Sequence, residues 1–139
     1  MTPLILNVIY ISGLLRKLFK TLDNKKYKEL VEKCFESGIR FGWDSCSCNK
    51  FINAIKDNPN FDKLYQMSEP CESSCFSLYS NVFGDFYPCS FTEGEYGWEK
   101  GISILNCNDF LKDIWYNEKT IKFRNKLLSM KRNCPTFYI

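Results

Sequence analysis

Eight cysteines in a chain of 139 residues that has no histidine restrict the chemistry and the fold more than any other feature of this sequence. The lack of histidine excludes Ser-His and Cys-His nucleophiles, histidine-ligated zinc or haem, and an imidazole base. An apolar run at 4–11 has no basic residue before it and no small-residue cleavage site after it, so it is a poor signal peptide, and it is too short to span a membrane. We therefore expect a cytoplasmic protein, in which clustered thiols more often bind metal than form disulfides.

Length and composition predict a single small α+β domain covering 1–139. Hydrophobic residues make up 45% of the chain and charged residues 25%, which is enough apolar material for a core. We expect a strand-helix-strand segment over 1–45, followed by a cysteine-rich region over 46–139. The best-defined helix begins at Asp23 or Asn24 and ends at Gly38, because its apolar residues recur at helical spacing. They are Tyr27, Leu30, Val31, Cys34 and Phe35.

The cysteine-rich region is predicted to combine short helices with a β-hairpin. Alternating side chains over 76–82, followed by Phe83-Gly-Asp85, predict a hairpin across 76–89. A short strand is expected at 102–105. Helices are expected near 49–56, 61–67, 109–115 and 118–130, the last with Asn117 as its cap.

Several motifs in this region resemble the C-terminal part of radical S-adenosylmethionine enzymes that carry a SPASM or twitch extension for an auxiliary cluster. The resemblance covers nearly the whole chain and is weakest over 1–22. Its motifs are Asp44-Ser45-Cys46, Pro70-Cys71-Glu72-Ser73, Gly84-x4-Cys89 within Pro88-Cys-Ser-Phe91, Trp98…Gly101-Ile102, Asp109-Phe-Leu-Lys-Asp-Ile-Trp115, Phe123-Arg124 and Cys134-Pro135…Tyr138.

This resemblance implies a SPASM/twitch-like fold in which four thiolates ligate an auxiliary [4Fe–4S] cluster. The implied metal ligands are Cys46, Cys71, Cys89 and Cys134. The Cys-x3-Cys-x2-Cys loop that reductive cleavage of S-adenosylmethionine requires is missing, because Cys71-x3-Cys75 is followed by Leu78 at the third position. No catalytic residue is therefore expected, and the chain should not generate radicals alone.

Three interpretations of the four candidate ligands remain open. They could hold an iron–sulfur cluster, they could hold zinc, which four cysteine thiolates satisfy fully, or they could be buried thiols without metal. Cys34 lies on the apolar face of its helix and is expected in the core. Cys48, Cys75 and Cys107 match no ligand position of the family.

The function predicted from these features is that of a non-enzymatic interaction protein derived from a radical S-adenosylmethionine enzyme. Single-domain size and a lysine-rich, alanine-poor composition suit a mobile-element or phage inhibitor of the anti-CRISPR type, with a protein or ribonucleoprotein as target. The alternative is an iron–sulfur accessory module that works with a separate radical enzyme. Direct contact with nucleic acid stays open, because basic stretches are most often solvated faces.

Partner contacts are expected at an apolar strand edge and on two basic stretches. Ile9 and Ile11 lie on a strand for which the chain encodes no preceding neighbour, so a partner, or self-association, should cover its edge. Basic residues concentrate at 16–33 and 119–132, where they would steer an acidic partner. The candidate contacts there are Lys122, Lys126 and Arg132. Aromatic side chains crowd the hairpin and the loop after it, and some of them should be exposed.

Overall fold

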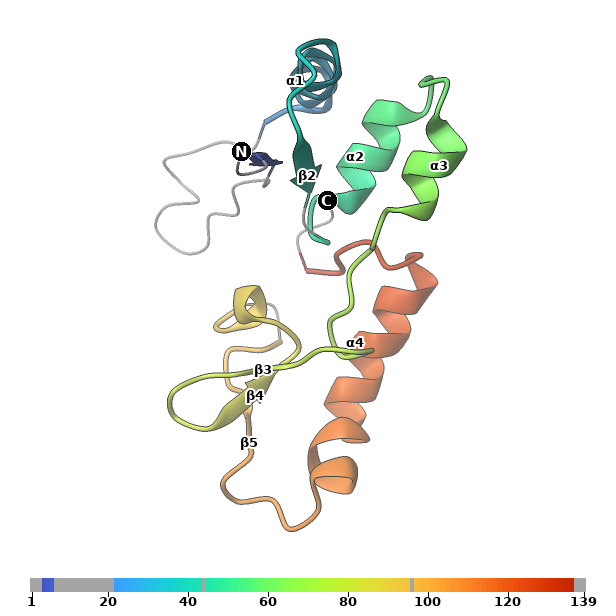
Figure 1. Ribbon diagram of the computed structural model, residues 1–139. Coiled ribbons are helices and arrows are strands. Elements are labelled where there is room, and N and C mark those ends of the chain that lie inside the picture. The colour runs from blue at the N-terminus through green and yellow to red at the C-terminus, as the bar shows by residue number, and fades with distance from the viewer. Residues whose placement is uncertain (1–3, 7–21, 44, 96, 137–139) are drawn as a thin grey trace. The chain divides into compact units, whose positions relative to one another are not determined.

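The computed structural model describes residues 4–6, 22–43, 45–95 and 97–136. The chain divides into two compact units, with the boundary between Cys71 and Glu72 (Figure 1). The sequence predicts one domain, in which a strand-helix-strand segment ends at residue 45 and a cysteine-rich region begins at residue 46. This single-domain organisation stays a prediction. Each unit has its own secondary structure and its own core.

The first unit contains three helices among its described residues: α1 (Asn24–Glu36), α2 (Cys48–Ile55) and α3 (Phe61–Gln66). Helix α1 begins where the sequence predicts, because the Asp23 carboxylate accepts a hydrogen bond of 2.8 Å from the backbone N–H of Lys26. The chain leaves the helix through Gly38, whose φ of 64° is favourable for glycine. Strand β1 (Leu4–Leu6) pairs in parallel with β2 (Phe41–Trp43), from Leu4 opposite Phe41 to Leu6 opposite Trp43.

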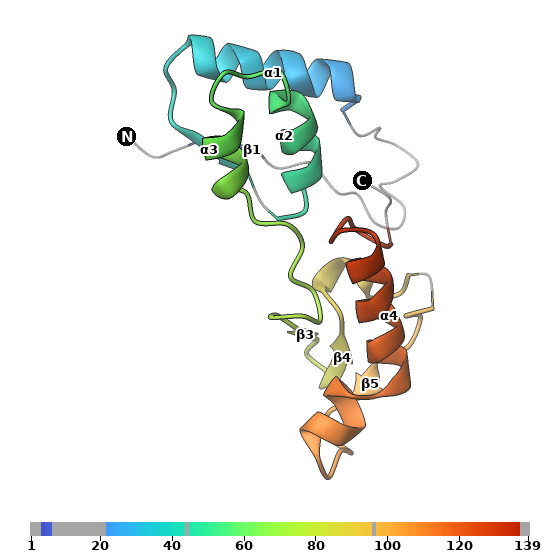
Figure 2. The same cartoon turned by 90° about the vertical axis from the view of Figure 1, so that its right-hand side faces the viewer.

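The core of the first unit forms where α1 packs on α2, and Figure 2 shows α1 crossing above the ends of α2 and α3. The Phe51 side chain is fully buried at its centre and stacks on Trp43, with ring centroids 3.5 Å apart. Cys34 is buried in this cluster, which confirms the prediction that it belongs to the core. The other buried members are Tyr27, Val31, Ala54 and Ile55.

The second unit contains the predicted hairpin. Strands β3 (Tyr79–Ser80) and β4 (Asp85–Tyr87) pair antiparallel, and β5 (Ile102–Ser103) pairs antiparallel with β4. The Asn81 side chain shapes the turn, because its Oδ1 accepts hydrogen bonds from the backbone N–H groups of Phe83 and Asp85, both at 3.0 Å. Gly84 completes the turn with a φ of 76°, which a side chain would strain.

Helix α4 (Glu118–Ser129) lies beside this three-stranded sheet in both views of the chain (Figures 1 and 2). It begins at the predicted cap, since the Asn117 side chain accepts from the N–H of Lys119 at 3.0 Å. Trp98 lies between Phe86 of the sheet and Phe123 of the helix and meets both rings edge to face. A 3-10 turn, η2 (Ser90–Thr92), and a π-helical turn, η3 (Leu111–Trp115), complete the unit.

The general α+β class and the hairpin at 76–89 are therefore confirmed. The SPASM/twitch-like detail stays a prediction. Within the described residues, no helix is both long enough and apolar enough to cross a membrane.

Candidate functional site

The four predicted metal ligands are distributed over both units. Cys46 is half-buried in the turn between β2 and α2, and Cys71 is buried at the end of the first unit. Cys89 and Cys134 are half-buried in the second unit. Across the described part of the chain, no three Cys, Asp or Glu side chains form a group that could hold a metal ion. The cluster or zinc site, and with it the accessory-module alternative, stays a prediction.

Serine substitutions distinguish bound metal from inert thiols. For bound metal, we expect Cys89→Ser to lower the melting temperature of anaerobically purified protein far more than Cys107→Ser, because losing a ligand removes binding energy that is coupled to folding. Cys107 is a suitable control since it is half-buried, whereas Cys48 is fully buried and a serine there would bury a hydroxyl. Equal, small effects at both positions, in a colourless sample, would contradict the metal site.

The residues predicted to contact a partner lie in different parts of the chain. Ile9 and Ile11 lie outside the described residues. Lys122 and Lys126 are exposed on α4 and line one pocket of the second unit. Arg132 does not line that pocket, because its guanidinium lies over the Phe76 ring, 5.6 Å from the centroid.

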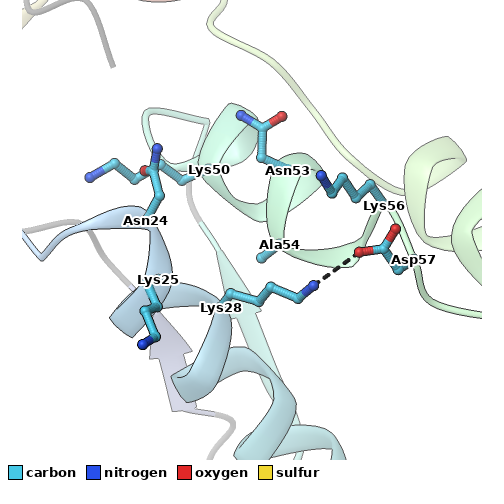
Figure 3. A pocket seen from close by; sticks show the side chains of 8 residues that line it. All are labelled: Asn24, Lys25, Lys28, Lys50, Asn53, Ala54, Lys56 and Asp57. Atoms are coloured by element: carbon cyan, nitrogen blue, oxygen red, sulfur yellow. Dashed lines mark hydrogen bonds and ion pairs between the residues drawn. The ribbon is translucent and has the colours of Figure 1, made fainter.

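A second basic pocket lies in the first unit, between α1 and α2. It has a volume of about 470 Å³, and four lysines and one aspartate contribute to its walls. Figure 3 shows Lys25 and Lys28 projecting from α1, while Lys50 and Asn53 project from α2. The complete lining is Asn24, Lys25, Lys28, Lys50, Asn53, Ala54, Lys56 and Asp57.

Two of these lysines have partners within the protein. The Lys28 ammonium lies 3.0 Å from the Asp57 carboxylate, and this hydrogen-bonded ion pair raises the pKa of Lys28 and lowers that of Asp57. Lys50 Nζ donates to the Leu22 carbonyl at 2.9 Å. Partial burial lowers the pKa of Lys50, an effect that the nearby Asp23 charge partly opposes.

The remaining two lysines, Lys25 and Lys56, are exposed and make no hydrogen bond or ion pair within the described part of the chain. Asp57 supplies the only carboxylate in the lining, so the pocket carries a net positive charge. Its ammonium and amide groups can donate hydrogen bonds to carboxylates or other anions. The lining contains no thiol or hydroxyl that could act as a nucleophile. Its chemistry is that of anion binding.

The sequence indicated a basic stretch at 16–33 but not this pocket. Helical spacing was the available signal: Lys25 and Lys28 are three residues apart on one helix, and Lys50 and Asn53 are three apart on the next. Those spacings place each pair on one helix face. They do not show that the two faces meet.

Comparisons of the chain with models of protein families, with curated proteins and with solved structures found no match. The resemblance to radical S-adenosylmethionine enzymes therefore stays a prediction.

Proposed function

We propose that this chain is a non-enzymatic interaction protein that binds a protein or ribonucleoprotein through an acidic face of that partner. The observation that carries the proposal is the pocket between α1 and α2, where lysines from two helices surround one space with a single carboxylate among them. A compact group of like charges raises the local concentration of an oppositely charged partner and increases its rate of association.

The lining of the pocket favours carboxylates of a protein as its ligands. No aromatic side chain lines it, so it offers no surface on which a base could stack. The amides of Asn24 and Asn53 add neutral donors beside the ammonium groups. Aspartate and glutamate side chains on a partner surface would accept from both kinds of donor.

Exposed apolar side chains at the hairpin support an interaction role independently. Val82 and Phe83 at the hairpin tip are 93% and 74% exposed, and Leu105, which is 77% exposed, packs against the turn at Gly84. Large exposed apolar groups of this kind mark interaction sites, and aromatic residues are frequent anchors in interfaces. The expectation that some aromatics near the hairpin are exposed is confirmed by Phe83 and by Phe76.

The finer assignment, an inhibitor of mobile-element or phage origin of the anti-CRISPR type, is supported by the family resemblance and by composition. The same resemblance, through the missing Cys-x3-Cys-x2-Cys loop, supports the proposal that the chain has no catalytic activity of its own. Formation of 5′-deoxyadenosine by reduced, iron-reconstituted protein would contradict it.

Removing the one carboxylate of the pocket should strengthen binding. We expect Asp57→Asn to bind poly-L-glutamate about two- to fivefold more tightly than the wild type at low salt, because Lys28 then pairs with the ligand instead of Asp57. Fluorescence anisotropy with labelled poly-L-glutamate measures the affinity.

Asp62→Asn is the matched control, since it changes the net charge equally from an exposed position on α3 that does not line the pocket. The proposal predicts a smaller gain for the control. Equal gains for both variants would show that net charge alone drives binding and would contradict a role for the pocket.

A further inference from the structure

The second unit has a basic pocket of its own, with a volume of about 280 Å³, beside helix α4. Three lysines, Lys119, Lys122 and Lys126, contribute to it, and no carboxylate does. Trp98 and Phe123 form an apolar part of its wall, and Thr136 adds a hydroxyl group. Both rings are almost entirely buried, with Trp98 4% and Phe123 9% exposed, so only their edges reach the pocket. This pocket therefore combines a row of positive charges with the apolar edges of two aromatic rings, which the pocket of the first unit lacks.

The lysines form a row because they are three and four residues apart on one helix. Seven residues of α-helix rise about 10 Å, so the row is too long for one phosphate or one carboxylate to reach every ammonium group. A ligand that uses the whole row must carry several negative charges along an extended chain.

Lys119 holds the most fixed position in this row. Its Nζ donates to the Lys100 carbonyl at 2.7 Å and lies 4.1 Å from the centroid of the Trp98 ring. Burial lowers the pKa of Lys119, against the opposing effect of Glu99. A partly dehydrated ammonium group in a fixed place pairs with an incoming anion without losing further side-chain freedom.

Lys126 is also positioned, since its Nζ donates to the Pro135 carbonyl at 3.1 Å. Lys122 lies between the other two along the helix and has no hydrogen bond or ion pair in the described part of the chain. The pocket thus presents two ammonium groups that hydrogen bonds to backbone carbonyls hold in position, and a third that is available for a ligand.

From this geometry we infer that the α4 pocket binds single-stranded nucleic acid, with consecutive phosphates along the lysine row. A phosphodiester chain carries regularly spaced negative charges, and its sugars and bases have apolar surface for the wall beside Trp98 and Phe123. An acidic peptide would match the charge but would leave this apolar wall uncovered. The inference goes beyond the proposed function, because the pocket belongs to the other unit and has its own test.

The test uses the full chain and a fluorescein-labelled ten-nucleotide oligo(dT) at several salt concentrations. Each lysine that contacts a phosphate of a single strand contributes about −0.7 to the slope of log K against log salt. We expect Lys122→Gln/Lys126→Gln to make that slope shallower by about 1.4. The control Lys63→Gln/Lys112→Gln, which removes the same charge from two exposed lysines outside the described pockets, should leave it nearly unchanged.

Acetylation of lysines in the wild-type protein, read by mass spectrometry, locates the contact without any substitution. Oligo(dT) should protect Lys122 and Lys126 but not Lys112, and it should do so equally in a Lys25→Gln/Lys56→Gln background, which separates this site from the pocket of the first unit. An equal slope change in both double variants would overturn the inference. Protection of Lys122 and Lys126 by poly-L-glutamate as strong as that by oligo(dT) would also overturn it.

Discussion

Phe51→Ala should lower the unfolding free energy of the first unit by about 3–5 kcal/mol, the range for removing a large aromatic side chain from a core. The Phe51 side chain is fully buried, stacks on Trp43 and meets Phe41 edge to face, with centroids 6.3 Å apart. Alanine would leave a cavity between α1, α2 and β2 that these rings cannot fill without moving. Because small units have little stability in reserve, a loss of this size should unfold most of the first unit.

Hydrogen exchange resolved by peptide measures this loss, with faster exchange expected over α1 and α2. The control is Phe83→Ala, the same chemical change at an exposed site on the hairpin tip, which should stay within about 0.5 kcal/mol of the wild type. Unchanged protection of α1 and α2 in Phe51→Ala would show that their packing is not what holds the first unit together.

Arg124→Ala should have the second-largest effect, about 2–3 kcal/mol, on the second unit. The guanidinium of Arg124 donates to the carbonyls of Ser74 and Trp115, and it lies 4.4 Å from the centroid of the Trp115 ring. It thereby joins the loop that precedes β3, the turn η3 and helix α4. Alanine removes both hydrogen bonds and leaves two carbonyl groups without this donor.

The Arg124→Lys variant distinguishes the contribution of the positive charge from that of the planar guanidinium group. Lysine keeps the charge but lacks the planar fork that reaches two carbonyls and stacks on a ring, so it should restore only part of the lost stability. Thermal unfolding and hydrogen exchange over 72–77 and 111–129 measure the effect, with Asn125→Ala on the exposed side of α4 as control. If Arg124→Ala is no less stable than Asn125→Ala, the guanidinium does not hold these segments together.

Local signals in the sequence predicted the elements whose ends depend on nearby residues. Helix α1 follows from the Asp23 cap, the spacing of its apolar residues and Gly38, and α4 follows from Asn117. The β3–β4 hairpin follows from the alternating side chains over 76–82 and from the turn residues Phe83-Gly-Asp85. Each of these signals acts within a few residues of the element that it defines.

The details that the sequence did not predict depend on contacts between distant segments or on unusual local geometry. The helix expected near 109–115 is the π-helical turn η3, which the Asp113 carboxylate links to the N–H groups of Asn108 and Asp109. Ser74 adopts a φ of 57°, which is uncommon for a residue with a side chain. No local pattern predicts either feature.

The candidate sites also could be predicted only where they depend on residues close together in the sequence. Helical spacing places Lys122 and Lys126 on one face of α4, and the sequence named both as partner contacts. The pocket between α1 and α2 exists only where these two helices pack together. Their packing depends on Phe51 of α2, which is separated from α1 in the sequence by strand β2 and a turn. The predicted convergence of Cys46, Cys71, Cys89 and Cys134 likewise depends on the tertiary fold and not on their spacing, and it stays a prediction.

Purification of the tagged full chain from the cells that naturally make it shows whether the lysines of the α1–α2 pocket hold a partner. The comparison is between the wild type, Lys25→Glu/Lys56→Glu in the pocket, and Lys33→Glu/Lys63→Glu at exposed lysines outside it. We predict that the wild type and the control retain the same partner at a fixed ratio, that this partner has an acidic face, and that the pocket variant loses it. Equal retention by the pocket variant, or a wild-type chain that elutes alone as a monomer, would contradict partner binding through this pocket.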